Sequence, residues 1–219
     1  MGAHDSLAVV FTGGDPPDAH DLRGLADRDA LVIAADSGLQ HAQRHGFAVD
    51  VVVGDLDSVD ADALAAAEAA GAIVERHPTA KDATDLELAL LAARDRGCDD
   101  IVVVGGGGGR ADHFFANALL LGAPHLAPLA IEARTGGATL TVVRHRVELV
   151  GAPGDILTLL ALGGPAVGVV TDGLRFPLRD ETLEPGSTRG VSNELESSIA
   201  RVSLRDGVLL AVQPREERS

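Results

Sequence analysis

Acidic side chains at a few positions of the sequence have a type and spacing that could bind a metal ion. Four of them stand directly after apolar runs or at the start of a helical segment: Asp36, Asp55, Asp57 and Asp85. Carboxylates gathered within a few ångströms repel one another strongly unless a cation neutralises them. A set of oxygen ligands favours Mg²⁺, which commonly binds one or two carboxylates together with water and substrate phosphates. These residues therefore predict a magnesium site.

A glycine run and two basic residues could bind the phosphates that accompany such an ion. Gly105–Gly109 follows an apolar run, and its last members, Gly108 and Gly109, directly precede Arg110. Glycine backbone N–H groups and the N-terminus of the following helix can bind phosphate oxygens. Lys81, the only lysine in the sequence, and Arg110 supply cationic contacts. We therefore predict a site for a Mg²⁺–nucleoside triphosphate, although the sequence has no GxxxxGK[ST] loop.

Each of these motifs also has a simpler explanation when it is taken alone. The segment 36–38 can begin a helix, because Asp and Ser cap free N–H groups. Asp55 and Asp57 can form a turn, and Thr84 with Glu87 matches a capping box. The binding-site interpretation is favoured because five carboxylates would gather at one edge of one sheet: Asp36, Asp55, Asp57, Asp85 and Asp112.

Alternating strand and helix patterns in the first half of the chain must position these residues. Short apolar runs predict strands at 7–11, 31–35, 51–53, 72–75 and 101–104. Helical patterns predict helices at 18–26, 39–45, 61–70, 85–96 and 112–121. This alternation predicts an α/β domain with a mostly parallel, Rossmann-like sheet, in which ligands bind beyond the carboxyl ends of the strands.

The second part of the chain lacks helical periodicity and is rich in short β-like runs. These runs lie at 140–143, 156–160, 167–170, 199–204 and 208–212, and Gly and Pro separate them. The pattern predicts a smaller all-β sandwich domain. We expect residues 1–128 to form the α/β domain and residues 129–219 to form the β-sandwich.

Composition narrows the classes of function that remain. The 219 residues carry 18 Lys+Arg against 33 Asp+Glu, a formal net charge of −15, which disfavours general nucleic-acid binding. The apolar runs are too short or too interrupted for a membrane span or a signal peptide, so no membrane association is expected. A single cysteine, Cys98, allows no intrachain disulfide and fits a reducing cytoplasm.

Five motifs in order make the chain resemble one family over about residues 7–212. They are Ala35-Asp36-Ser37-Gly38, Gly54-Asp55-Leu56-Asp57-Ser58, Lys81-Asp82-Ala83-Thr84-Asp85, Gly109-Arg110-Ala111-Asp112-His113 and Ser192-Asn193-Glu194. Together they are similar to the successive motifs of the thiamine pyrophosphokinase (thiamine diphosphokinase) family. The second and third motifs are the specific ones, whereas the Ser-Asn pair alone would be a weak signal.

The resemblance implies an activity and an assembly. The α/β domain 1–128 would bind ATP and carry catalysis, and the β-sandwich 129–219 would bind thiamine. The reaction would move a pyrophosphoryl group from Mg²⁺–ATP to the thiamine hydroxyl, which gives thiamine diphosphate and AMP. Members of the family are homodimers with active sites formed between the subunits, so a homodimer is expected here.

The resemblance also assigns roles to the matching residues. The Mg²⁺ and phosphate-site carboxylates would be Asp36, Asp55, Asp57 and Asp85. Further phosphate and substrate contacts would come from Lys81, Thr84, Arg110 and Asp112. Ser192 and Asn193 would contact the thiamine pyrimidine. Asp85 and Asp112 both stay open as acceptors of the hydroxyl proton.

One departure from the family pattern bears on the acceptor. Many members have an aromatic residue after the Ser-Asn pair, but Glu194 and Leu195 follow it here, and the chain has no Trp or Tyr. A hydroxymethylpterin pyrophosphokinase and a non-catalytic nucleotide-binding module are therefore kept as alternatives. His41 and His45, spaced four residues apart, are expected to lie on a solvated helix face.

Overall fold

The first part of the chain forms an α/β unit around a parallel sheet. The structure is a computed structural model, and it describes residues 6–80 and 82–215. The strands of this unit are β1 (Leu7–Phe11), β2 (Ala30–Ala35), β3 (Val51–Gly54), β4 (Ile73–Arg76), β5 (Asp100–Val104) and β6 (Ala130–Arg134). They run in the order β6-β5-β1-β2-β3-β4, and every neighbouring pair is parallel. The predicted mostly parallel sheet is confirmed.

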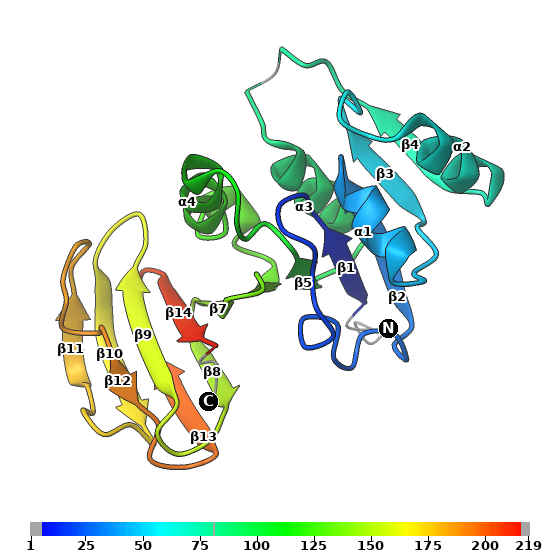
Figure 1. Cartoon of the computed structure of the whole chain (residues 1–219). Coiled ribbons are helices and arrows are strands. Elements are labelled where there is room, and N and C mark those ends of the chain that lie inside the picture. The colour runs from blue at the N-terminus through cyan, green and yellow to red at the C-terminus, as the bar shows by residue number, and fades with distance from the viewer. Residues whose placement is uncertain (1–5, 81, 216–219) are drawn as a thin grey trace, which may run out of the picture. The chain divides into compact units, whose positions relative to one another are not determined.

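Helices bury the sheet on both faces, as parallel sheets require. The helices that cover the sheet are α1 (Gly38–Arg44), α2 (Ala61–Ala69) and α3 (Asp85–Asp95), whereas α4 (Ala111–Leu120) has no buried residue in the described part of the chain. Alternate strand residues such as Phe11, Ala34 and Val52 pack with α1 and α2 in two buried clusters. The strand residues between them point to the opposite face, where α3 packs against β1, β2 and β3 (Figure 1).

The predicted helix at 18–26 is wrong, because this segment forms a series of turns. Asp18 Oδ1 accepts hydrogen bonds from the backbone N–H groups of His20 and Asp21, at 2.8 and 3.0 Å. Asp21 is fully buried, and its carboxylate accepts from the N–H groups of Asp18 and Gly136. Side chains that satisfy local backbone donors in this way compete with a helix.

The second unit consists of two antiparallel sheets with a shared apolar core. One sheet has the order β12-β9-β14-β7, from β7 (Ala138–Val143), β9 (Ile156–Ala161), β12 (Asn193–Glu194) and β14 (Leu209–Pro214). The other has the order β11-β10-β13-β8, from β8 (Arg146–Val150), β10 (Ala166–Asp172), β11 (Arg179–Leu183) and β13 (Ile199–Ser203). Leu157 and Leu209 of the first sheet pack in one cluster with Val169 and Val202 of the second. This is the sandwich-like architecture that the sequence predicts.

The two units do not divide at one point of the chain, as a boundary between residues 128 and 129 assumes. The first unit extends to Asn117 and includes residues 128–136, because β6 pairs with β5. The second unit takes residues 118–127, with a short 3₁₀ helix at Pro124–Leu126, and continues from Gly137. Within residues 6–80 and 82–215, no helix has the length and apolar character that a membrane span needs.

Candidate active site

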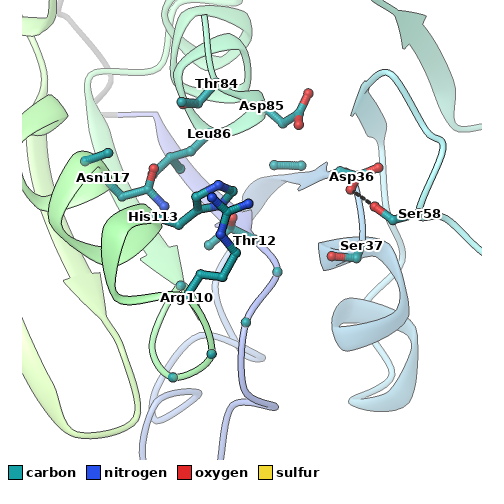
Figure 2. A pocket seen from close by; sticks show the side chains of 17 residues that line it. Thr12, Asp36, Ser37, Ser58, Thr84, Asp85, Leu86, Arg110, His113 and Asn117 are labelled. Atoms are coloured by element: carbon teal, nitrogen blue, oxygen red, sulfur yellow. Dashed lines mark hydrogen bonds between the residues drawn. The ribbon is translucent and has the colours of Figure 1, made fainter. Parts of the chain in front are cut away.

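A cavity of about 440 Å³ lies at the carboxyl ends of the strands of the first unit. Its walls come from the loops after β1, β2 and β5 and from the first turns of α3 and α4. Figure 2 shows Asp36, Ser37 and Ser58 on one side, opposite Arg110, His113 and Asn117. Parallel sheets bind ligands at this edge, so the cavity is where the sequence places the site.

Asp36 enters the cavity from a strained backbone position directly after β2. Its φ is +47°, which is uncommon for a residue with a side chain, and its N–H donates to the carbonyl oxygen of Val53 at 2.9 Å. The Ser58 hydroxyl donates to Asp36 Oδ2. The other oxygen, Oδ1, is buried without a hydrogen-bond partner among the described residues. A buried carboxylate oxygen in this state is costly unless a cation or donor meets it.

Asp55 and Asp57 stand beside Asp36. One carboxylate oxygen from each of the three residues lies within 4.8 Å of the other two. The pKa of Asp57 is raised above its ordinary value, first by the negative charge of Asp55 and then by a hydrogen bond with it, with Asp36 and Asp85 adding to the effect. The cluster is therefore electrostatically unfavourable without a cation.

Gly54 lets the fourth carboxylate approach. It ends β3 with φ of +149°, and a Cβ there would lie 3.1 Å from Asp85 Oδ1 and 3.3 Å from Asp36 Cβ. Asp85, at the start of α3, and Asp36 therefore both flank Gly54, although the Asp85 oxygens lie outside the group that Asp36, Asp55 and Asp57 form within 4.8 Å. Thr84 caps the same helix by accepting a hydrogen bond from the Glu87 N–H at 3.2 Å, and it lines the cavity as well.

Three of these carboxylates, those of Asp36, Asp55 and Asp57, fit a magnesium ion, and Asp85 adds negative charge nearby. They offer only oxygen ligands, the negative charge of Asp55 and then a hydrogen bond with it raise the pKa of Asp57, and Asp36 Oδ1 has no partner among the residues described. Mg²⁺ prefers such ligands and keeps coordination positions for water and phosphates. Ser37 does not serve as the helix cap that the simpler explanation of its motif suggests, because its side chain makes no capping hydrogen bond to α1. It lines the cavity instead.

The glycine loop is packed against the loop after β1. The Gly106 N–H donates to the Gly13 carbonyl oxygen at 2.7 Å, and the Asp15 N–H donates to the Gly107 carbonyl oxygen at 2.8 Å. A Cβ at Gly108 would displace the Asp15 carboxylate, and φ of +70° at this position favours glycine. Gly109 has φ of +61°, and a Cβ there would meet nothing within 4 Å, so this residue faces open space beside the cavity.

Arg110 and Asp112 form an ion pair at the start of α4. Arg110 Nε lies 3.1 Å from Asp112 Oδ1, and a second guanidinium nitrogen donates to Asp112 Oδ2. The pairing lowers the pKa of Asp112 and raises that of Arg110. Arg110 lines the cavity, whereas Asp112 does not.

Ser192 and Asn193 lie in the second unit, where β12 begins. The Ser192 N–H donates to Thr158 Oγ1 at 3.0 Å, and Ser192 has φ of +55°. Asn193 is buried, and its Oδ1 accepts from the N–H groups of Phe176 and Glu194, both at 2.9 Å. Its Nδ2 donates to the Phe176 carbonyl oxygen at 2.7 Å. Asn193 therefore holds the backbone of Phe176 from both sides.

The predicted site residues thus fall into distinct places. Asp36, Thr84, Asp85, Gly108, Gly109 and Arg110 line one cavity, and Lys81 lies outside the described residues. Reasoning from the sequence missed Ser58 as a partner of Asp36, although it completes the motif that contains Asp55 and Asp57. It also misplaced His41, which is buried against the Gly14 carbonyl oxygen and does not lie on a solvated face.

Comparisons with known proteins agree with this arrangement. The family model of the thiamin pyrophosphokinase catalytic domain matches residues 22–129, and that of the vitamin B1 binding domain of thiamin pyrophosphokinase matches residues 144–209. A thiamine pyrophosphokinase of Bacillus subtilis (strain 168) is 27% identical over 214 residues, which cover 93% of this chain and 96% of the relative.

Solved structures give the same result. The crystal structure of thiamine pyrophosphokinase from Bacillus subtilis matches with a TM-score of 0.82 and 26% identity, over 96% of this chain and 99% of that one. That of thiamin pyrophosphokinase from Geobacillus thermodenitrificans matches with a TM-score of 0.81 and 26% identity, over 97% and 99%. Fold and matches together define a transferase of the kinase class. The chain belongs to the thiamine pyrophosphokinase family, whose activity is thiamine diphosphokinase.

Proposed function

We propose that this thiamine pyrophosphokinase binds Mg²⁺ and the ATP phosphates in the cavity of the first unit. The observation that carries the proposal is the convergence of Asp36, Asp55, Asp57 and Asp85, with one buried oxygen of Asp36 lacking a partner among the described residues. A Mg²⁺ ion held by these carboxylates would supply a divalent charge that offsets the negative charge of the phosphates in the transition state.

The opposite wall would hold the phosphates. Arg110 offers a planar set of donors for phosphate oxygens, and the backbone at Gly109 is open to the cavity. Phosphates that enter would compete with the Asp112 carboxylate for the Arg110 guanidinium. Lys81 remains a proposed phosphate contact on the sequence motif alone.

The reaction moves a pyrophosphoryl group to a hydroxyl oxygen. The acceptor oxygen attacks the β-phosphorus of ATP, the bond from that phosphorus to the oxygen of the α-phosphate breaks, and AMP leaves. Asp112 is the poorer acceptor for the hydroxyl proton, because Arg110 lowers its pKa and it does not line the cavity. We assign the proton to Asp85, which lines the cavity and stands outside the three carboxylates, Asp36, Asp55 and Asp57, whose oxygens gather within 4.8 Å of one another.

Phe176 gives the second unit an aromatic surface for thiamine. Its ring is 50% exposed, the guanidinium of Arg175 lies 5.5 Å from its centroid, and Asn193 holds its backbone. The backbone of Phe176 therefore lies beside Asn193, and its exposed ring can supply the stacking that Glu194 and Leu195 cannot. Replacement of Phe176 by Ala should raise the KM for thiamine about tenfold, whereas Phe176→Leu, which keeps an apolar side chain, should raise it less.

A homodimer in the cytoplasm is also proposed. In the structure as described, α4 has no buried residue although it is mostly apolar, and Phe115 and Leu119 are 64% and 63% exposed on one helix face. Exposed apolar surface of this kind commonly marks an association site. Replacement of Phe115 by Asp should turn a dimer into a monomer in sedimentation experiments.

The activity is tested with purified protein, Mg²⁺–ATP and one acceptor at a time. We expect AMP and thiamine diphosphate to form with thiamine, and no AMP to form when Mg²⁺ is replaced by EDTA. Release of AMP only with a hydroxymethylpterin, or ATP binding without AMP release, would contradict the assignment. Asp36→Asn tests the proposed metal site in the same assay, since it keeps the shape of the side chain and removes its charge.

A further inference from the structure

A buried histidine packs behind the loop that forms one wall of the cavity. His41 lies in the middle of α1 and is only 7% exposed, and its Nε2 lies 3.2 Å from the Gly14 carbonyl oxygen. A carbonyl oxygen can only accept a hydrogen bond, so Nε2 carries a proton and donates it. Nothing in the proposed mechanism uses this side chain.

The approach of α1 to the loop explains how the ring reaches Gly14. Ser37, Gly38 and His41 lie on one face of the helix. Gly38 packs directly on the Phe11 carbonyl oxygen, and Gly13 packs directly on the Ser37 hydroxyl. A side chain at Gly38 would meet backbone atoms and force the loop away from α1, whereas one at Gly13 would displace the Ser37 hydroxyl. The loop therefore lies along this face of α1. The hydrogen bond from His41, in the middle turn of α1, joins the helix to the Gly14 carbonyl oxygen of the loop.

The protonation state of His41 fits a single donated hydrogen bond. Burial lowers the pKa of the ring. The hydrogen bond to Gly14 raises it in part, and the nearby Arg44 and His45 lower it again, so the net shift is downward and the ring is neutral at neutral pH. A neutral ring has one N–H, which is on Nε2. Its Nδ1 is buried and has no partner within residues 6–80 and 82–215, so a second proton would be buried without an acceptor.

Gly14 connects the histidine to the cavity. Thr12, Gly13 and Gly14 all line it. The same loop is hydrogen-bonded to the glycine loop, through the Gly106 N–H on the Gly13 carbonyl oxygen. A displacement of Gly14 would therefore change the cavity wall and also the loop that leads to Arg110.

We infer that His41 is a positioning residue for nucleotide binding: its Nε2–H fixes the Gly14 carbonyl and so holds the Thr12–Gly14 loop as a wall of the cavity. The inference rests on the proposed ATP site. His41 does not touch the nucleotide. It acts through the loop, so its loss should weaken ATP binding and leave thiamine binding unchanged.

Two substitutions separate the hydrogen bond from the packing. His41→Leu fills the space but leaves the Gly14 carbonyl without a donor, and it should raise the KM for ATP about five- to tenfold, with the KM for thiamine within about twofold of the original. His41→Gln can place an amide N–H near the position of Nε2, and it should keep the KM for ATP within about twofold. Calorimetric titration with Mg²⁺–AMP, which leads to no turnover, should show the same order of affinities.

The controls make each outcome decisive. If His41→Leu does not fold, His41→Asn, whose amide is too short to reach Gly14, replaces it in the comparison with His41→Gln. Equal nucleotide affinity in all variants would overturn the role of His41, as would an equal loss in His41→Gln and His41→Leu. If Asp36→Asn and Arg110→Ala also leave ATP affinity unchanged, the ATP site itself is wrong; if they weaken it and His41→Leu does not, only this inference fails.

Discussion

The two groups of residues that the motifs single out differ in how the protein satisfies their polar atoms. In the first unit, Asp36 keeps a buried oxygen without a partner among the described residues, and Asp57 is held beside like charges. In the second unit, Asn193 makes three hydrogen bonds, all to the protein's own backbone. The first group leaves polar atoms that a ligand could meet, as we propose, whereas the polar atoms of Asn193 are used by the fold. A residue of such a motif can therefore act by contact with a ligand or by hydrogen bonds that hold the neighbouring backbone in place.

Removal of one carboxylate from the first group should have the largest effect on activity. Asp57→Ala should fold normally and lose activity by about three orders of magnitude, because a Mg²⁺ ligand is removed from a reaction that depends on charge neutralisation. The unfolding temperature of the metal-free protein should not fall, since the substitution relieves repulsion with Asp55. The measurements are kcat and thermal unfolding followed by circular dichroism. Near-normal turnover would remove Asp57 from the metal site.

The second prediction breaks the other group and should show the opposite pattern. Asn193→Ala leaves two backbone N–H groups and the Phe176 carbonyl without their buried partner, which should cost about 2 kcal/mol of stability. For a chain of this size, that corresponds to an unfolding temperature lower by roughly 4–8 °C. Ser192→Ala is the matched control, because its backbone hydrogen bond to Thr158 remains. An unchanged unfolding temperature in Asn193→Ala would contradict the structural role.

The sequence predicted the first group better than the second for a physical reason. Carboxylates after parallel strands must meet at one sheet edge, and their repulsion indicates a cation without knowledge of side-chain contacts. The hydrogen bonds of Asn193 to Phe176 join residues 17 positions apart across a loop, and no local pattern reports them. The turns at 18–26 were not predicted for the same reason, since the Asp21 carboxylate accepts one of its hydrogen bonds from the distant Gly136 N–H.

The strands that the sequence missed are of a similar kind. β6, β8 and β11 carry charged residues, and each has a clear partner in the sheet: β6 pairs with β5, β8 with β13, and β11 with β10. Periodicity reports burial, so a strand with several polar side chains gives a weak signal although its backbone pairing is complete. The position of His41 was missed because glycines at 13 and 38 permit a close approach that only coordinates reveal.

Within the first unit, substitution of Asp112 should affect turnover much less than substitution of Asp85. The Arg110–Asp112 pair is satisfied internally, like Asn193, yet Arg110 faces the cavity. Asp112→Asn should therefore change kcat less than about tenfold, whereas Asp85→Asn should lower it by about three orders of magnitude. Steady-state kinetics of the two variants side by side decides between them. An equally large loss of kcat in Asp112→Asn would indicate that Asp112, and not Asp85, accepts the proton of the hydroxyl group.

The smallest expected effect is the pH dependence of the metal-free protein. Folding raises the pKa of Asp57 above its ordinary value of 3.8, so over this pH range the folded state binds more protons at Asp57 than the unfolded state. Its contribution to stability therefore decreases as the pH rises from about 3.8 through the raised pKa. Asp112, whose pKa is lowered by Arg110, contributes in the opposite direction below that range. The comparison of wild type with Asp57→Asn in EDTA isolates Asp57: the difference in unfolding temperature should grow in favour of the variant as the pH rises, and saturating Mg²⁺ should reverse its sign. A difference that stays constant with pH would mean that the carboxylates repel one another less than their spacing implies, and the contrast with the second unit would then rest on Asp36 alone.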